Sequence, residues 1–240
     1  MMCGSDDNNR ETRMTDLTLV YLKMRALGEA PQMMLSYRGE PYRYQMAWAY
    51  FGTPWPEAKP SLPFRQLPML VTETGQQIVQ SGSIMRYLAQ RLGLTSPDPL
   101  RAAAIDEIFE GSQELFFPLN PTVNFFTGDK FRESQEALLK TLETRLADFE
   151  RLLGRHDGAF FFGKEPVYCD FGVFHHVDLA HFLDGQILTA FPAMQDFMSA
   201  MKMLPGLGEY LAARPELIDV GIGPKLVIDG TAVSTGMSPD

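Results

Sequence analysis

The spacing of apolar and polar positions predicts alternating short strands and helices over residues 17–92. The run LTLVYL is typical of a buried strand, and PYRYQMAW alternates with the period of two that a strand requires. PMLVTE and QQIVQ flank the turn residues Thr74 and Gly75 and predict a hairpin. EAPQMMLSYRG lies between the first two strands as a helix, and residues 81–92 place apolar side chains on one helical face.

The order of these elements restricts the topology. A helical crossover between the first two strands makes them parallel, and the hairpin then adds an antiparallel edge. A long loop separates the second strand from the hairpin. We expect a small α/β layer of the thioredoxin type over residues 17–93.

Helical patterns alone fill the second half of the chain. Asp98 and Pro99 supply an N-cap and a first-turn proline for a helix that Pro118 and Pro121 should bend or end. Because strand signals vanish from about residue 97, we expect an all-helical domain. Its further helices are predicted over residues 136–153, 168–183, 192–203 and 206–213.

The predicted fold class is therefore α+β, with a thioredoxin-like domain followed by an all-α domain. The domains span residues 17–93 and 98–222. The polar, acidic opening over residues 1–16 is expected to be a disordered tail, and residues 223–240 a C-terminal tail that frays at VSTGMSPD.

Composition excludes several classes of protein. Of the 240 residues, 45% are hydrophobic and 21% charged, and the net charge of −9 argues against nucleic acid or an anionic membrane as a partner. No apolar run approaches the roughly 20 residues of a membrane span. Cys3 and Cys169 form no disulfide framework, and the opening is unlike a signal peptide, which favours a cytoplasmic protein.

Two features near the hairpin suggest a binding site. A cis bond before Pro68 would turn the backbone of Leu67 outward, where it could pair with an extended peptide. Gln80 and Ser81 begin a helix, whose free N–H groups suit a carboxylate. From these residues alone, an edge-strand proline and a serine N-cap are the favoured interpretation.

The arrangement resembles the glutathione transferase family, whose fold would comprise the two predicted domains. In that family a residue before a cis-proline pairs with the cysteinyl backbone of glutathione, which here implies Gln66-Leu67-Pro68. A Gln/Glu-Ser pair that holds the γ-glutamyl carboxylate matches Gln80 and Ser81. The resemblance covers roughly residues 17–220.

The stretch WPEAKPSLPFRQLPML resembles the sigma class in particular, with some mu-like features. Trp55 and Lys59 match residues that contact the glycine end of glutathione, and a lysine suits a carboxylate as a point charge. Tyr21 matches the family's catalytic tyrosine, and Arg25 an arginine near the site. Leu27 replaces a second arginine of the sigma class, which weakens a prostaglandin isomerase assignment.

The resemblance implies a role for Tyr21 that its chemistry supports. A thiol like that of cysteine has a pKa near 8.5 and is only a few per cent ionised at pH 7. A hydrogen bond from the tyrosine hydroxyl to the thiolate would favour the charged form. Tyrosine is otherwise most often one more half-buried strand aromatic, and that alternative stays open here.

The helical domain is expected to cover a hydrophobic acceptor site. Glu114, or alternatively Gln113, matches an acidic residue that reaches the neighbouring subunit's glutathione in related homodimers. The candidate pocket aromatics, each of which could instead be a core residue, are Phe116, Phe117, Phe125 and Phe126.

No metal site is expected. His175, His176 and His181 could suggest one, but adjacent histidines point to different helix faces and no HExxH or paired-cysteine spacing occurs. We therefore interpret these histidines as structural.

The leading hypothesis is a detoxifying, homodimeric enzyme that adds the thiolate of its cosubstrate glutathione to hydrophobic electrophiles. A non-catalytic ligand-binding or structural protein on the same scaffold is one alternative. A glutathione-dependent isomerase or peroxidase, similar to prostaglandin D synthase, is another.

Overall fold

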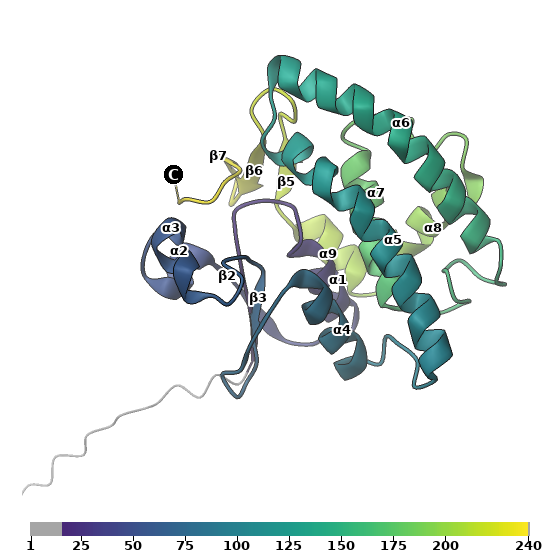
Figure 1. Cartoon of the computed structure of the whole chain (residues 1–240), viewed down its shortest axis with the longest axis horizontal. Helices are drawn as coiled ribbons and strands as arrows, with labels where there is room; N and C mark the ends of the chain where they lie inside the picture. The colour runs from purple at the N-terminus through teal and green to yellow at the C-terminus, as the bar shows by residue number, and fades with distance from the viewer. Residues whose placement is uncertain (1–15, 240) are drawn as a thin grey trace, which may run out of the picture.

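The structure is a computed structural model that describes residues 16–239 of the chain. The tail expected over residues 1–16 therefore lies outside the described residues, apart from Asp16. An α/β half carries one side of the molecule and a helical half the other, with two long helices along its outer side (Figure 1). This division agrees with the predicted fold class.

The α/β half is built on a four-stranded sheet of order β2-β1-β3-β4. β1 pairs with β2 in parallel and with β3 antiparallel, and β3 pairs antiparallel with β4, as predicted. Every residue of β1 is buried, as expected for a strand covered on both faces. The elements are β1 (Leu17–Tyr21), α1 (Glu29–Tyr37), β2 (Tyr42–Met46), α2 (Ala47–Phe51), α3 (Trp55–Ala58), the 3-10 helix η1 (Lys59–Ser61), β3 (Met69–Val71), β4 (Gln77–Val79) and α4 (Ser81–Arg91).

The helical half packs around one central helix, α7, which is buried along almost its whole length. A helix that is buried on all sides lies inside a bundle, and α7 accordingly packs against both α5 and α1. The helices are α5 (Pro99–Asn124), α6 (Gly128–Leu153), α7 (Tyr168–Ala180), α8 (Pro192–Lys202) and α9 (Leu207–Ala213).

Of the two outcomes expected at Pro118 and Pro121, a bend or an end of the helix, the end does not occur there, because α5 continues to Asn124. A proline inside a helix removes one backbone donor and costs about 3 kcal/mol or more. Leu119 and Val123 are fully buried on the same helix, and their packing opposes that cost. The Thr122 hydroxyl also donates to the Pro118 carbonyl oxygen at 2.7 Å.

The second half is not wholly helical. Three antiparallel strands follow α9: β5 (Glu216–Ile218), β6 (Lys225–Ile228) and β7 (Thr231–Ser234). Two of them lie within residues 223–240, where we expected a fraying tail. The missed signal was KLVIDGTAVS, in which Asp229 and Gly230 both adopt positive φ (49° and 76°) between alternating strands, a common hairpin turn.

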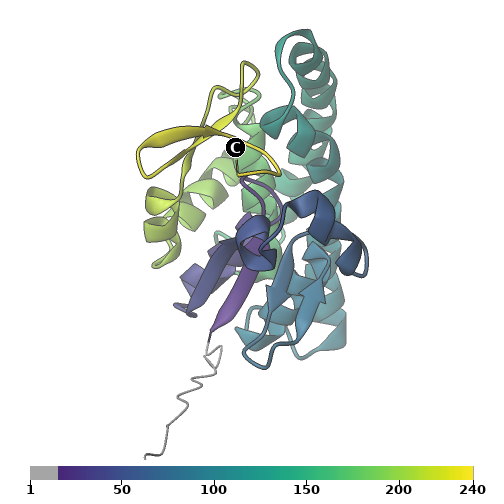
Figure 2. The same ribbon diagram turned by 90° about the vertical axis from the view of Figure 1, so that its left-hand side faces the viewer.

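The end of the chain crosses back to the α/β half (Figure 2). Gly236 pairs with Lys23 through two backbone hydrogen bonds of 3.2 and 2.9 Å, just after β1. The Lys23 ammonium donates to the Pro239 carbonyl oxygen at 2.8 Å, and the Thr235 hydroxyl donates to that of Asn124 at 2.5 Å. The C-terminal segment is thus held against the loop that follows Tyr21.

A largely buried cluster of four charges links the two halves. The Arg214 guanidinium donates to Glu29 of α1 at 3.1 Å and to Asp178 of α7 at 2.7 Å. Arg25 lies 4.0 Å from Asp178 and donates to the Pro215 carbonyl oxygen at 2.6 Å. Two cations and two carboxylates balance one another, as buried charges require.

Replacement of Arg214 tests how much this cluster contributes to stability. Arg214→Gln removes the cation that pairs with both Glu29 and Asp178 and leaves these two largely buried carboxylates with Arg25 alone. We therefore expect the free energy of unfolding to fall by about 3–5 kcal/mol. Lys225→Gln, which breaks the half-exposed pair with Asp219, should cost about 0–1 kcal/mol. Urea denaturation of both variants measures the difference, and equal losses would contradict a structural role for the cluster.

Candidate functional site

A cavity of about 360 Å³ lies between the α/β half and α5. Its α/β wall is formed by the end of β1, the α3–η1 segment, the loop before β3 and the start of α4. These elements bring together seven residues that the sequence marked as candidates: Tyr21, Trp55, Lys59, Gln66, Leu67, Gln80 and Ser81.

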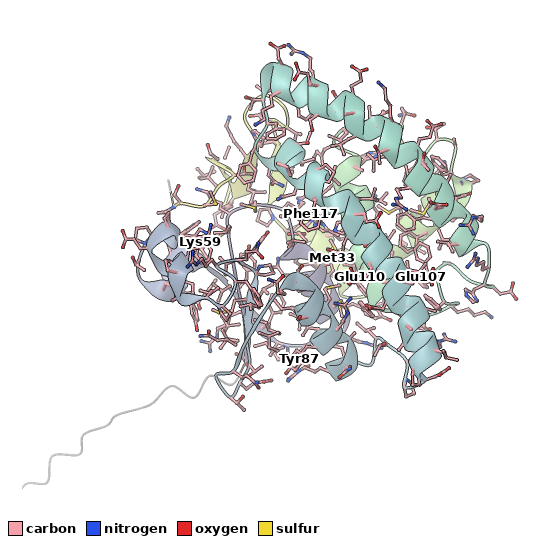
Figure 3. All side chains as sticks on the ribbon, viewed as in Figure 1. Met33, Lys59, Tyr87, Glu107, Glu110 and Phe117 are labelled. Carbon is pink, nitrogen blue, oxygen red and sulfur yellow. The ribbon has the colours of Figure 1, made fainter. Side chains whose placement is uncertain are left out.

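The opposite wall of the cavity comes mainly from α5. Figure 3 shows Phe117 on this helix and Lys59 on the other side of the cavity. Phe116 and Phe125 line the same wall, as expected. Phe126 is not among the lining residues, because its ring instead lies beneath the Lys130 ammonium at 3.9 Å.

Sequence reasoning missed two residues of this wall, Asn120 and Met237. Asn120 lies one helical turn beyond Phe116 on α5, so the helical period could have identified it. Met237 reaches the cavity only because Gly236 is paired to Lys23. No local pattern predicts that long-range contact.

Tyr21 is buried at the end of β1, and its hydroxyl oxygen accepts a hydrogen bond from the Leu27 backbone N–H at 3.2 Å. Burial raises the pKa of Tyr21 well above its usual value, and the Leu27 bond opposes this rise only in part. The phenol therefore keeps its proton at neutral pH. With a lone pair engaged by Leu27, the hydroxyl can donate that proton to a group in the cavity.

Gly28 determines how closely the backbone approaches the Tyr21 ring. A Cβ at this position would lie 2.7 Å from Cδ1 and 3.1 Å from Cγ of that ring, nearer than van der Waals contact allows. The φ of Gly28 is an ordinary −80°, so the glycine is needed for space and not for backbone conformation. Sequence reasoning did not identify this residue.

The start of α4 presents backbone donors to the cavity. The first intrahelical bond runs from the Ile84 N–H to the Gln80 carbonyl oxygen, which leaves the preceding N–H groups as the usual unsatisfied donors of a helix N-terminus. Gln80 adopts a φ of 72°, and its side-chain amide donates to Gln66 at 3.2 Å. The Leu67–Pro68 peptide bond is cis, as the family resemblance implied.

Comparisons with known proteins identify the family. A model of the glutathione S-transferase C-terminal domain matches residues 119–214. The chain is 31% identical over 196 residues to "Glutathione S-transferase P 10" of Caenorhabditis elegans, covering 82% of this chain and 90% of that protein. The chain belongs to the glutathione S-transferase family.

Other relatives of this transferase carry different class names. It is 29% identical to the class-mu 26 kDa isozyme 7 of Fasciola hepatica over 80% of this chain and 87% of that protein. The structure of a Pi-class transferase of Onchocerca volvulus superposes with a TM-score of 0.72 at 27% identity, covering 82% and 92% of the two chains. These likenesses establish the family and its fold, and they leave the class open.

Three candidate glutathione-site residues of the transferase are not part of the cavity lining: Pro68, which directly follows the lining residue Leu67, Arg25 and Glu114. Arg25 lines a neighbouring cavity, where its guanidinium bonds to the Pro215 carbonyl oxygen. Burial and the nearby Arg214 lower the pKa of Arg25. Glu114 lies on the exposed side of α5 and forms an ion pair with Arg145 of α6.

Within residues 16–239 of the transferase, no group of three or more His, Cys, Asp and Glu side chains could hold a metal ion. His175 and His176 are buried in α7, and their rings lie against Phe116. No helix in the same range is long and apolar enough to cross a membrane.

Gly28→Ala tests whether the position of the Tyr21 ring matters. The added methyl group should displace the ring and reduce kcat/KM for glutathione conjugation by about 10–100-fold, the scale for small misplacements of a reacting group. Gly111→Ala is the matched control, because a Cβ there meets nothing within 4 Å. Retained activity in Gly28→Ala, with both variants folded by circular dichroism, would show that the close approach is unimportant.

Proposed function

We propose that this transferase binds glutathione in the cavity and uses Tyr21 to stabilise its thiolate. The observation that carries the proposal is that Tyr21 lines the cavity while its hydroxyl oxygen accepts the Leu27 N–H, which leaves the O–H free to donate. The α4 N-terminus lines the same cavity and suits a carboxylate. One tripeptide with a central thiol and terminal carboxylates matches both features.

The termini of glutathione would be held at two places. Gln80 and Ser81 would bind the γ-glutamyl carboxylate with the first N–H groups of α4. Trp55 and Lys59 would bind the glycine end, where the lysine supplies a positive charge for the second carboxylate. Between them, the Leu67 backbone next to Pro68 would pair with the cysteinyl residue, as in the family.

The chemical step follows from the position of the thiol. Its proton leaves to solvent, and the Tyr21 O–H donates a hydrogen bond to the resulting thiolate. A decrease of about two units in the thiol pKa, roughly 2.7 kcal/mol, would ionise most of the bound thiol at pH 7. The sulfur lone pair then forms a bond to an electrophilic carbon, and the leaving group departs with its electron pair.

The α5 wall would form the acceptor site for this carbon. Phe116, Phe117 and Phe125 present aromatic surface, and Asn120 places one polar amide among them. Such a lining favours hydrophobic electrophiles with a polar substituent, which is consistent with a role in detoxification.

Further assignments extend this proposal. The WPEAKPSLPFRQLPML stretch supports a sigma-like class, whereas Leu27 argues against prostaglandin isomerase specificity. We also propose a thioredoxin-like domain over residues 17–93, a second domain that begins at residue 98 and extends beyond the expected boundary at residue 222 to include β5–β7, and a cytoplasmic location. The family resemblance supports a homodimer in which Glu114 reaches the partner's site. To do so, Glu114 would have to break its ion pair with Arg145.

Tyr21→Phe tests the chemical role directly. Loss of the hydroxyl should raise the pKa of the bound thiol by about two units and reduce kcat/KM at pH 6.5 by up to about 100-fold. The loss should shrink at high pH, where glutathione ionises unaided. Conjugation of 1-chloro-2,4-dinitrobenzene across pH 5.5–9 measures this profile, with Tyr87→Phe on α4 as the control.

A pH profile unchanged by Tyr21→Phe would remove this residue from the mechanism. Retention on immobilised glutathione without turnover of any electrophile in a panel would favour the ligand-binding alternative.

The homodimer has a separate test. Light scattering after size-exclusion chromatography should give about twice the 27.0 kDa chain mass. If Glu114 completes the partner's site, Glu114→Gln should raise KM for glutathione without dissociating the dimer. A monomer with full activity would contradict both statements.

A further inference from the structure

A second cavity of about 310 Å³ lies next to the first and shares two lining residues with it. One wall comes from the α/β half, through Met46 at the end of β2 and Gln32 of α1. The other comes from the C-terminal strands, through Leu226 and Ile228 of β6 and the neighbouring Pro215. Tyr21, Gln80 and Ser81 are not part of it, so it is distinct from the proposed glutathione site.

The two cavities are separated by the segment that follows Tyr21. Leu22 and Met24 line both of them, whereas the intervening Lys23 pairs with Gly236 and Pro239. These contacts keep the separating segment in place from the C-terminal side. The second cavity is therefore part of the fold and exists because β5–β7 pack across the α/β half.

Each polar side chain that lines this cavity has a partner within the protein, including Tyr210, which bonds with Glu29, and Arg214, which donates to Glu29. Arg25 donates to the Pro215 carbonyl oxygen, and the Gln32 amide donates to that of Gly28 and accepts from Tyr42. The Tyr44 hydroxyl donates to the Leu22 carbonyl oxygen at 2.9 Å. Recognition of a ligand is consequently left to the apolar part of the lining.

The charges at the cavity also favour one type of ligand. Arg25, Arg214 and Glu29 line it, and Asp178, which is not part of the lining, pairs with both arginines, so two carboxylates balance the two cations. A charged ligand would upset this balance and would lose its hydration without gaining an uncompensated partner. An uncharged apolar molecule meets neither penalty.

We propose that this second cavity binds a small, uncharged, mainly apolar molecule, independently of glutathione. The cavity lies at the lower end of the volumes typical of ligand sites, about 300–1,000 Å³, which suits a compound of two or three rings. Six apolar side chains supply its contacts: Leu22, Met24, Met46, Pro215, Leu226 and Ile228.

Two dyes that differ by one charged group test the proposal. N-phenyl-1-naphthylamine is uncharged, and 8-anilinonaphthalene-1-sulfonate adds a sulfonate to the same rings. Both gain fluorescence on binding and can be excited beyond the tryptophan absorption band. Titrations with the full chain would include saturating S-hexylglutathione, which occupies the glutathione site and the adjacent acceptor wall.

Neighbouring positions on β6 provide matched variants. Ile228 lines the cavity, whereas Val227 faces the other side of the strand and is not part of the lining. Ile228→Trp fills the cavity and should weaken binding of the uncharged dye at least ten-fold, while Val227→Trp should change it less than two-fold. Met46→Trp, on the opposite wall, repeats the test if Ile228→Trp does not fold.

Three outcomes would overturn the proposal. One is equal dye affinity in the Ile228 and Val227 variants, and another is complete displacement of the uncharged dye by S-hexylglutathione. The third is tighter, Ile228-dependent binding of the sulfonated dye, which would make the site an anion site. Preferential, Ile228-dependent binding of the uncharged dye beside S-hexylglutathione supports it.

Discussion

The hydrogen bond from the Leu27 N–H to the Tyr21 hydroxyl connects the fold to the chemistry. This bond orients the Tyr21 hydroxyl group and engages one lone pair of its oxygen. The bond depends on β1 being buried at the centre of the sheet and on Gly28 allowing the ring to approach the backbone. Because Leu27 and Gly28 lead into α1, whose Glu29 bonds to Arg214, the same loop also connects the two halves.

Much of this arrangement could be predicted from the sequence because it depends on local patterns. The buried run LTLVYL, the alternation in PYRYQMAW and the hairpin around Gly75 determine the strand order and directions. Gln80 and Ser81 lie at the start of α4, as their pattern indicates. Residues at strand ends and helix starts converge on one edge of a sheet, so these candidates line one cavity.

The remainder depends on contacts between distant segments. Arg25 follows Tyr21 closely in sequence, yet the attraction of Asp178 and Pro215 directs it into the second cavity. The burial of Leu119 and Val123 maintains α5 past two prolines, which propensity alone does not predict. The hairpin at Asp229–Gly230 had a clear local signal, but its packing across the α/β half did not.

The placement of Met237 has a practical consequence for work with this protein. The residue sits two positions before Pro239, whose carbonyl oxygen Lys23 holds, and its side chain faces the acceptor wall. A purification tag at the C-terminus would thus follow closely on a residue that lines the proposed glutathione cavity. Substitutions at Met237 would therefore change the lining of this cavity, and with it the range of substrates, without disturbing the hydrophobic core.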